Sequence, residues 1–204
     1  MGSKPQTEAE VVERAQREAE VRALCERGEH QRAVALALEL YGGEIIGFLA
    51  ATCERKDSVG EIHSELCETL CTEIPRFEWR ASLRTWMYAL ARNARHRYHL
   101  RQRRGDRVVP LSQAPEPHVK SATSVAVYKR TTMKERLAAA RATLAVEERE
   151  LLVLRVDRGL SWAEIAGILK EDEEDLVRAS AALRKRFERT MEKLKRLFAE
   201  MGQP

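Results

Sequence analysis

The sequence has few cysteines, no apolar leader and no long apolar run. Its four cysteines, at positions 25, 53, 67 and 71, are too few and too irregularly spaced for a secreted disulfide scaffold. The N-terminal stretch, residues 1–20, lacks the apolar segment of a signal peptide. No window approaches the ~18 uninterrupted apolar residues that a membrane helix needs. We therefore expect a cytoplasmic protein without a membrane span.

Motifs that carry catalysis are also missing. The chain has no Walker loop, no Gly-rich dinucleotide turn, no His-Glu-x-x-His pair and no nucleophile elbow. We therefore predict that the protein is not an enzyme and needs no cofactor.

One helical stretch carries His63, Cys67 and Cys71 at four-residue spacing. Two of these three could share a metal ion. All three cannot, because eight residues of helix span about 12 Å, whereas zinc ligands lie about 2.0–2.3 Å from the ion. Approach of Cys25 or Cys53 could complete a site, but we favour small buried residues and predict no metal site.

The residue pattern is helical almost throughout. Hydrophobic residues make up 44% and charged residues 33% of the chain, which is a globular composition. Strand-like alternation is absent, and apolar residues recur at helical spacing. Gly42 and Gly43 predict a weak break in the second helix. The expected helices cover residues 7–26, 30–40, 44–54, 58–74, 81–104 and 125–145, followed by a helical unit at 146–200.

A change of composition divides the chain. Residues 108–124, "VVPLSQAPEPHVKSATS", contain three prolines and several small polar residues. Proline fixes φ and lacks a backbone donor, so this segment predicts an extended connector. We predict an all-α protein with two helical domains, at 20–107 and 130–200, joined by a flexible linker at 108–129.

Positive charge is concentrated before this connector. The chain as a whole has a net charge of only +4, but residues 76–107 contain ten arginines against Glu78 and Asp106. In "RASLRTWMYALARNARHRYHLRQRR", residues 80–104, the aromatic residues Trp86, Tyr88 and Tyr98 are interleaved with arginines. Such a segment is typical of nucleic-acid binding, although charge runs are often only solvated surface.

The C-terminal unit has the pattern of a helix-turn-helix. A helix is predicted over 147–158, and Gly159 ends it. Ser161 and Glu164 form a capping box that begins a short helix, and a third, long helix starts near Glu174. This order of elements suits DNA binding, while a plain three-helix bundle with a solvated face stays an alternative. The basic residues of the third helix that we expect at DNA are Arg178, Arg184, Lys185, Arg186 and Arg189.

Three segments together resemble bacterial extracytoplasmic-function sigma factors of the sigma-70 family. "SLRTWMYALARNARHRYHLRQRR" is similar to the segment joining regions 2.3 and 2.4, and "LAVEERELLVLRVDRGLSWAEIAGIL" to the start of region 4. "LCERGEHQRAVALALELYGGEIIGFL", residues 24–49, looks like the opening of region 2. The resemblance covers roughly residues 20–198. Its most specific element is the pattern of Trp86, Ala91, Arg92 and Asn93.

The resemblance implies a transcription initiation factor that binds core RNA polymerase and promoter DNA and is held by an anti-sigma factor. The domain at 20–107 would bind polymerase and melt the −10 element, and the helix-turn-helix would bind the −35 element. We expect Trp86 in the core, and Phe77 and Trp79 either at a flipped base or in the core. The implied −10 residues are Phe77, Trp79, Arg80, Arg84, Arg92, Asn93, Arg95, Arg97 and Arg101.

Two departures from the family pattern leave other functions open. In "DSVGEIHSELCETL" only Asp57 remains of the acidic polymerase signature, and Glu61, Glu65 and Glu68 are the candidate substitutes. Residues 171–175 are all acidic, which is unfavourable beside phosphates but acceptable at a helix start. The alternatives are a sigma-like adaptor that binds polymerase or a regulator without reading promoters, and a helix-turn-helix transcription regulator.

Overall fold

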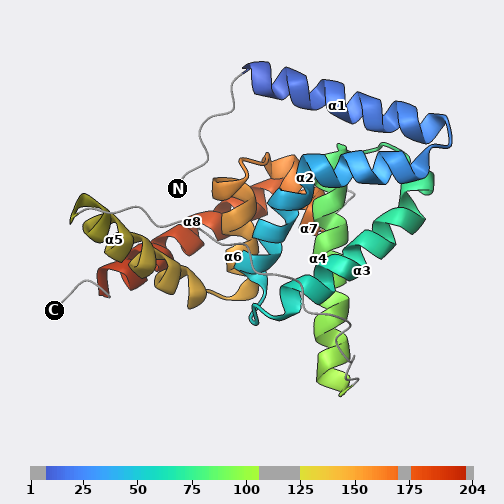
Figure 1. The fold of residues 1–204 in the computed structure, drawn as a ribbon. Helices are drawn as coiled ribbons and strands as arrows, with labels where there is room; N and C mark the ends of the chain where they lie inside the picture. The colour runs from blue at the N-terminus through green and yellow to red at the C-terminus, as the bar shows by residue number, and fades with distance from the viewer. Residues whose placement is uncertain (1–7, 106–124, 170–175, 201–204) are drawn as a thin grey trace.

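All regular structure in the described part of the chain is helical, as predicted. The computed structural model describes residues 8–105, 125–169 and 176–200 (Figure 1). The elements, in chain order, are α1 (Glu8–Glu26), α2 (His30–Thr52), α3 (Ser58–Glu73), η1 (Ile74–Arg76), α4 (Leu83–Arg104), α5 (Val125–Ala142), α6 (Val146–Leu152), η2 (Val153–Asp157), α7 (Trp162–Leu169) and α8 (Leu176–Glu200).

Helix α2 is continuous, so the predicted break at Gly42 and Gly43 is wrong. A glycine inside a helix costs only about 1 kcal/mol relative to alanine. The fully buried side chains of Ile45, Phe48 and Leu49 follow directly, and burying each contributes roughly 1.5–3 kcal/mol. Packing therefore outweighs the local propensity.

The N-terminal unit is built around α2. Helix α2 contacts α1, α3 and α4, and α1 runs alongside the first part of α2 at the top of Figure 1. Helix α4 turns Leu83, Met87, Tyr88 and Ala91 into this core. By length and composition α2 could cross a membrane, but nine of its residues are buried in the protein, as in the core helix of a folded domain.

The C-terminal unit contains the predicted helix-turn-helix, with one correction. The α-helix expected over 147–158 ends early. Helix α6 ends at Leu152, and the next residues form the π-helical turn η2. Gly159 follows with φ +68°, a left-handed conformation that favours glycine. The predicted capping box is present: the Ser161 amide donates to Glu164 at 2.7 Å, and the Glu164 amide donates to Ser161 Oγ at 3.3 Å.

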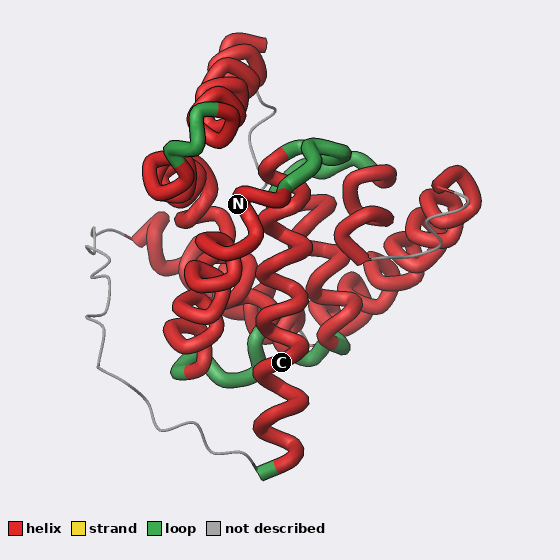
Figure 2. Tube along the Cα trace, turned by 90° about the vertical axis from the view of Figure 1, so that its right-hand side faces the viewer, coloured by secondary structure: helices red, strands yellow, loops and turns green. Residues whose placement is uncertain are grey.

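The two units pack against each other. Buried residues of α6, η2 and α7 belong to the same apolar core as those of α2 and α4, and a smaller cluster holds α5 to α6 and α8. Most of the predicted linker at 108–129 lies outside the described residues, but α5 already begins at Val125. The C-terminal end of α4 projects from the body of the molecule in both views (Figures 1 and 2).

Candidate nucleic-acid interface

The candidate interface is organised by α4, whose first turn is capped from two directions. Ser82 has an extended backbone, and its Oγ accepts a hydrogen bond from the Thr85 amide at 3.1 Å. The Glu18 carboxylate, from α1, accepts from the amides of Leu83 at 3.3 Å and Arg84 at 3.2 Å. These bonds satisfy donors that have no partner within the helix, and a negative charge suits this end of it. Sequence reasoning missed Glu18 because it is distant along the chain from α4.

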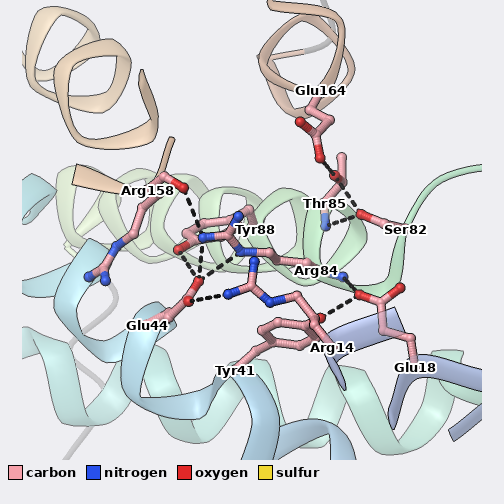
Figure 3. Close-up of polar contacts among 10 residues, drawn as sticks. All are labelled: Arg14, Glu18, Tyr41, Glu44, Ser82, Arg84, Thr85, Tyr88, Arg158 and Glu164. Carbon is pink, nitrogen blue, oxygen red and sulfur yellow. Dashed lines mark hydrogen bonds and ion pairs between the residues drawn. The ribbon is translucent and has the colours of Figure 1, made fainter. Parts of the chain in front are cut away.

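Arg84 occupies the centre of a buried polar cluster rather than the surface (Figure 3). Its Nε donates to Glu44 Oε2 at 2.8 Å, and its Nη2 donates to the Arg158 carbonyl oxygen at 3.0 Å. Tyr88 also donates to Glu44 Oε2, at 3.1 Å. Burial, reinforced by the Glu44 charge, raises the pKa of Tyr88 well above its usual value. Only 8% of the Arg84 side chain is exposed, so DNA cannot reach it in this conformation.

Arg95 and Arg92 meet a buried carboxylate of the C-terminal unit. Arg95 Nη2 lies 2.6 Å from Glu150 Oε1, and Arg92 Nε lies 3.4 Å from the same oxygen. Arg95 Nη1 also donates to the Thr52 carbonyl oxygen at 3.3 Å. Glu150 is 1% exposed and Arg95 is 8% exposed. Two of the arginines expected at promoter DNA are therefore paired within the protein.

The C-terminal half of α4 pairs instead with α3. Glu65 receives Arg97 Nε at 2.8 Å and Arg101 Nη2 at 2.5 Å. Partial burial alone would raise the Glu65 pKa, but the hydrogen bonds from Arg101 and Arg97 outweigh it and lower the pKa overall. Glu65, which we expected to bind polymerase, thus pairs with Arg97 and Arg101, which we expected to bind DNA.

The other residues expected at polymerase are spread along α3 and its start. Asp57 is exposed and pairs with Arg55 at 2.5 Å. Glu61 is half-buried, whereas Glu68 is exposed. Among the four, Asp57 and Glu68 are therefore the most accessible carboxylates.

Two aromatic residues before α4 and one in its first turn stack on one another. The Phe77 and Trp86 ring centroids are 4.2 Å apart at an interplanar angle of 13°, and Phe77 lies 4.7 Å from Trp79. All three are partly buried at the edge of the core. Trp79 has φ +58°, which is uncommon for a residue other than glycine and is often found at functional sites. Arg80 is exposed beside Glu78, and Asn93 is half-buried.

A basic surface lies on α8. A hollow there is lined by the alanines at 181 and 182 and by Arg178, Lys185, Arg186 and Arg189. Arg184 is exposed on the same helix. Four of the five residues expected at the −35 element therefore surround one surface, whose two small side chains leave room for a close approach. The acidic residues 171–175 lie outside the described residues.

The histidine and cysteines of α3 are only partly buried, so the expectation of small buried residues is wrong for Cys71. His63 Nδ1 lies 3.8 Å from Cys67 Sγ, while Cys71 is exposed. Burial lowers the pKa of His63 and raises the pKa of the Cys67 thiol, which disfavours the thiolate that a metal would bind. Within residues 8–105, 125–169 and 176–200, no three metal-binding side chains come together.

The structure has a counterpart among solved proteins. It matches the sigma factor RpoE of Bartonella quintana, in its complex with the anti-sigma factor NepR, with a TM-score of 0.55. The fold is similar to that of a sigma factor. The match covers 79% of this chain and 94% of that chain at 19% sequence identity, so it is longer than either helical unit of this chain alone. The sequence itself matches no family model and no curated protein.

Proposed function

We propose that this protein is an extracytoplasmic-function sigma factor that binds core RNA polymerase and directs promoter recognition and melting of the −10 element. The observation that carries the proposal is the sigma-like fold, which includes both an arginine-rich α4 and a basic α8. A chain with two separate basic helices can contact two separate elements of DNA. This role requires no catalysis or cofactor and belongs in the cytoplasm.

The positions of several residues in the structure support the contact that we propose for each. On the −10 side, the aromatic stack of Phe77 and Trp79, before α4, with Trp86, in the first turn of α4, offers π-faces to unstacked bases. On the −35 side, the hollow of α8 offers basic groups to phosphates and base edges. Asp57 and Glu68 are the accessible carboxylates for the polymerase.

The proposed partners include an anti-sigma factor. The matching sigma factor was solved together with one, and the two proteins share the fold. We propose that a protein of this class binds the present chain while it is not engaged with polymerase.

Run-off transcription tests the proposal. Core RNA polymerase, the purified chain and a library of promoter templates should give transcripts that are absent without the chain. Trp79→Ala should change which −10 sequences are used, because base contacts specify sequence. Glu147→Gln, at an exposed position of α6, serves as a matched variant that should leave the promoter choice unchanged. If polymerase is bound but no template yields a transcript, the sigma function is excluded.

The internal pairing of Arg84, Arg92 and Arg95 favours a second candidate, a sigma-like adaptor that binds polymerase or a regulator without reading promoters. The same experiment separates the two candidates. An adaptor would bind its protein partner in a pull-down titration but would neither select nor melt a promoter. An ordinary helix-turn-helix regulator would bind a specific DNA sequence without core polymerase and would give no transcript that depends on the chain.

A further inference from the structure

A single stripe of α4 faces the C-terminal unit. Arg84, Tyr88, Arg92 and Arg95 are spaced by three or four residues, so they lie on one side of the helix. Three of them bind polar groups of the C-terminal unit: Arg84 binds the carbonyl of Arg158, directly after η2, and Arg92 and Arg95 bind Glu150 of α6. Beside them, Thr85 Oγ1 donates to Glu164 Oε1 of α7 at 3.4 Å.

Glu150 makes the contacts that a phosphate would make. Its two oxygens accept from Arg95 Nη2 at 2.6 Å and Arg92 Nε at 3.5 Å. Arginine binds carboxylate and phosphate with the same planar donor geometry, so an acid in this position occupies the donors that would hold DNA. The carboxylate is almost fully buried, and such a charge is tolerated only when it is paired.

We propose that the C-terminal unit, through Glu150, closes over α4 and withholds Arg92 and Arg95 from DNA. The proposal rests on the proposed function, since it concerns access to the DNA-binding face. In the closed chain Arg92 and Arg95 bind Glu150 of α6, and in the open chain they bind phosphates. Any partner that binds the apolar surface of α6 and α7 would therefore also release the arginines, because the same surface contacts α2 and α4.

The test compares two variants of the full chain that have the same net charge. Glu150→Gln removes the buried negative charge with which both arginines pair, whereas Glu147→Gln removes an exposed acid from the same helix. Small-angle scattering detects opening as an increase in the radius of gyration. A closed chain of this length has a radius of gyration of about 17 Å. Fluorescence anisotropy with a labelled random-sequence duplex measures DNA affinity over a range of KCl concentrations.

We expect Glu150→Gln to enlarge the radius and raise DNA affinity about tenfold over Glu147→Gln, as when a binding-competent state changes from a minor to the major population. The dependence of log affinity on log salt should steepen by about two, because Arg92 and Arg95 would each neutralise one further phosphate. If both variants have the wild-type radius and the same salt dependence, the proposal is wrong and the proposed function is unaffected. If Glu150→Gln has a larger radius of gyration but binds DNA no more tightly than Glu147→Gln, this face of α4 does not bind DNA.

A second measurement needs no variant and remains decisive if Glu150→Gln does not fold. Binding and opening are coupled reciprocally, so DNA must favour the open chain as much as opening favours DNA. Hydrogen exchange of the α6 and η2 amides in the wild-type chain should therefore accelerate several-fold when duplex DNA is added. Unchanged or slower exchange in residues 146–157, with DNA bound, would contradict the closed contact.

Discussion

Two parts of α4 contain the same kind of residue and use it differently. In the part up to Arg95, Arg84 and Arg95 are buried and bind groups of other elements, including the C-terminal unit. In the part after Arg95, Arg97 and Arg101 pair with Glu65 at a more exposed position, and Arg103 and Arg104 are exposed. Arginine content alone therefore does not define a DNA-binding face. The second unit, packed on one side of the helix, decides which arginines are structural in the closed chain.

The largest effect should come from breaking the buried pair. Arg95→Met leaves Glu150 with only the longer Arg92 contact, and removing one partner of a buried ion pair costs about 3–5 kcal/mol. We expect the free energy of unfolding to fall by up to that amount, measured by urea titration followed by circular dichroism. The double variant Arg95→Met with Glu150→Met should recover most of the loss, because two apolar side chains leave no unpaired charge. A loss below about 0.5 kcal/mol, typical of surface sites, would mean that the pair is not buried in solution.

A smaller effect is expected at the start of α4. Ser82→Ala removes the side-chain cap of the Thr85 amide, and loss of an N-cap costs about 1 kcal/mol. Ser64→Ala is the matched control, since its hydroxyl lies on the exposed side of α3 and donates only to the Gly60 carbonyl oxygen. Thermal unfolding should separate the two variants. Equal midpoints would indicate that the Glu18 carboxylate alone suffices to cap α4.

The ion pairs of Glu65 with Arg97 and Arg101 should contribute less to the free energy of unfolding, and their contribution should depend on pH. We expect Glu65→Gln to cost at most about 1 kcal/mol at pH 7, because the pair is partly solvated. The folded chain lowers the Glu65 pKa below its ordinary value of 4.5. Its stabilisation is therefore present above pH 4.5 and lost as pH falls through the lowered pKa. The difference between wild type and Glu65→Gln should vanish in acid, whereas a difference that persists there would assign the effect to packing.

Sequence reasoning reached the fold because the fold depends on local signals. Helical periodicity, the Ser161–Glu164 capping box and Gly105 at the end of α4, with φ +78°, are all readable within a few residues. The break predicted at Gly42 was wrong because burial of the following residues overrides propensity. The early end of α6 at η2 also escaped prediction, since a π-turn leaves no local signature.

The candidate site was less predictable because its partners are distant in sequence. The spacing of the arginines identified α4, but nothing near Arg95 indicates Glu150, and nothing near Leu83 indicates Glu18. Glu150 is one of several acids in its helix, and only tertiary packing distinguishes it from the exposed Glu147. Whether an arginine binds a carboxylate or a phosphate is therefore a property of the assembled chain rather than of the motif.

The exposed end of α4 should give the smallest change in stability and an effect on DNA of a different kind. Arg103 and Arg104 are exposed on the part of the helix that projects from the molecule (Figure 2). Arg103→Gln should change the free energy of unfolding by no more than about 0.5 kcal/mol, as at other surface sites. If this end contacts the phosphate backbone, the variant should lose affinity equally on all duplex sequences and lower the salt dependence by about one. Arg27→Gln, an exposed arginine after α1 and away from α4, is the control for net charge. If both variants show the same dependence of log affinity on log salt, the projecting end does not contact DNA. A lower slope for Arg103→Gln alone would show that the exposed end of α4 binds DNA even in the closed chain.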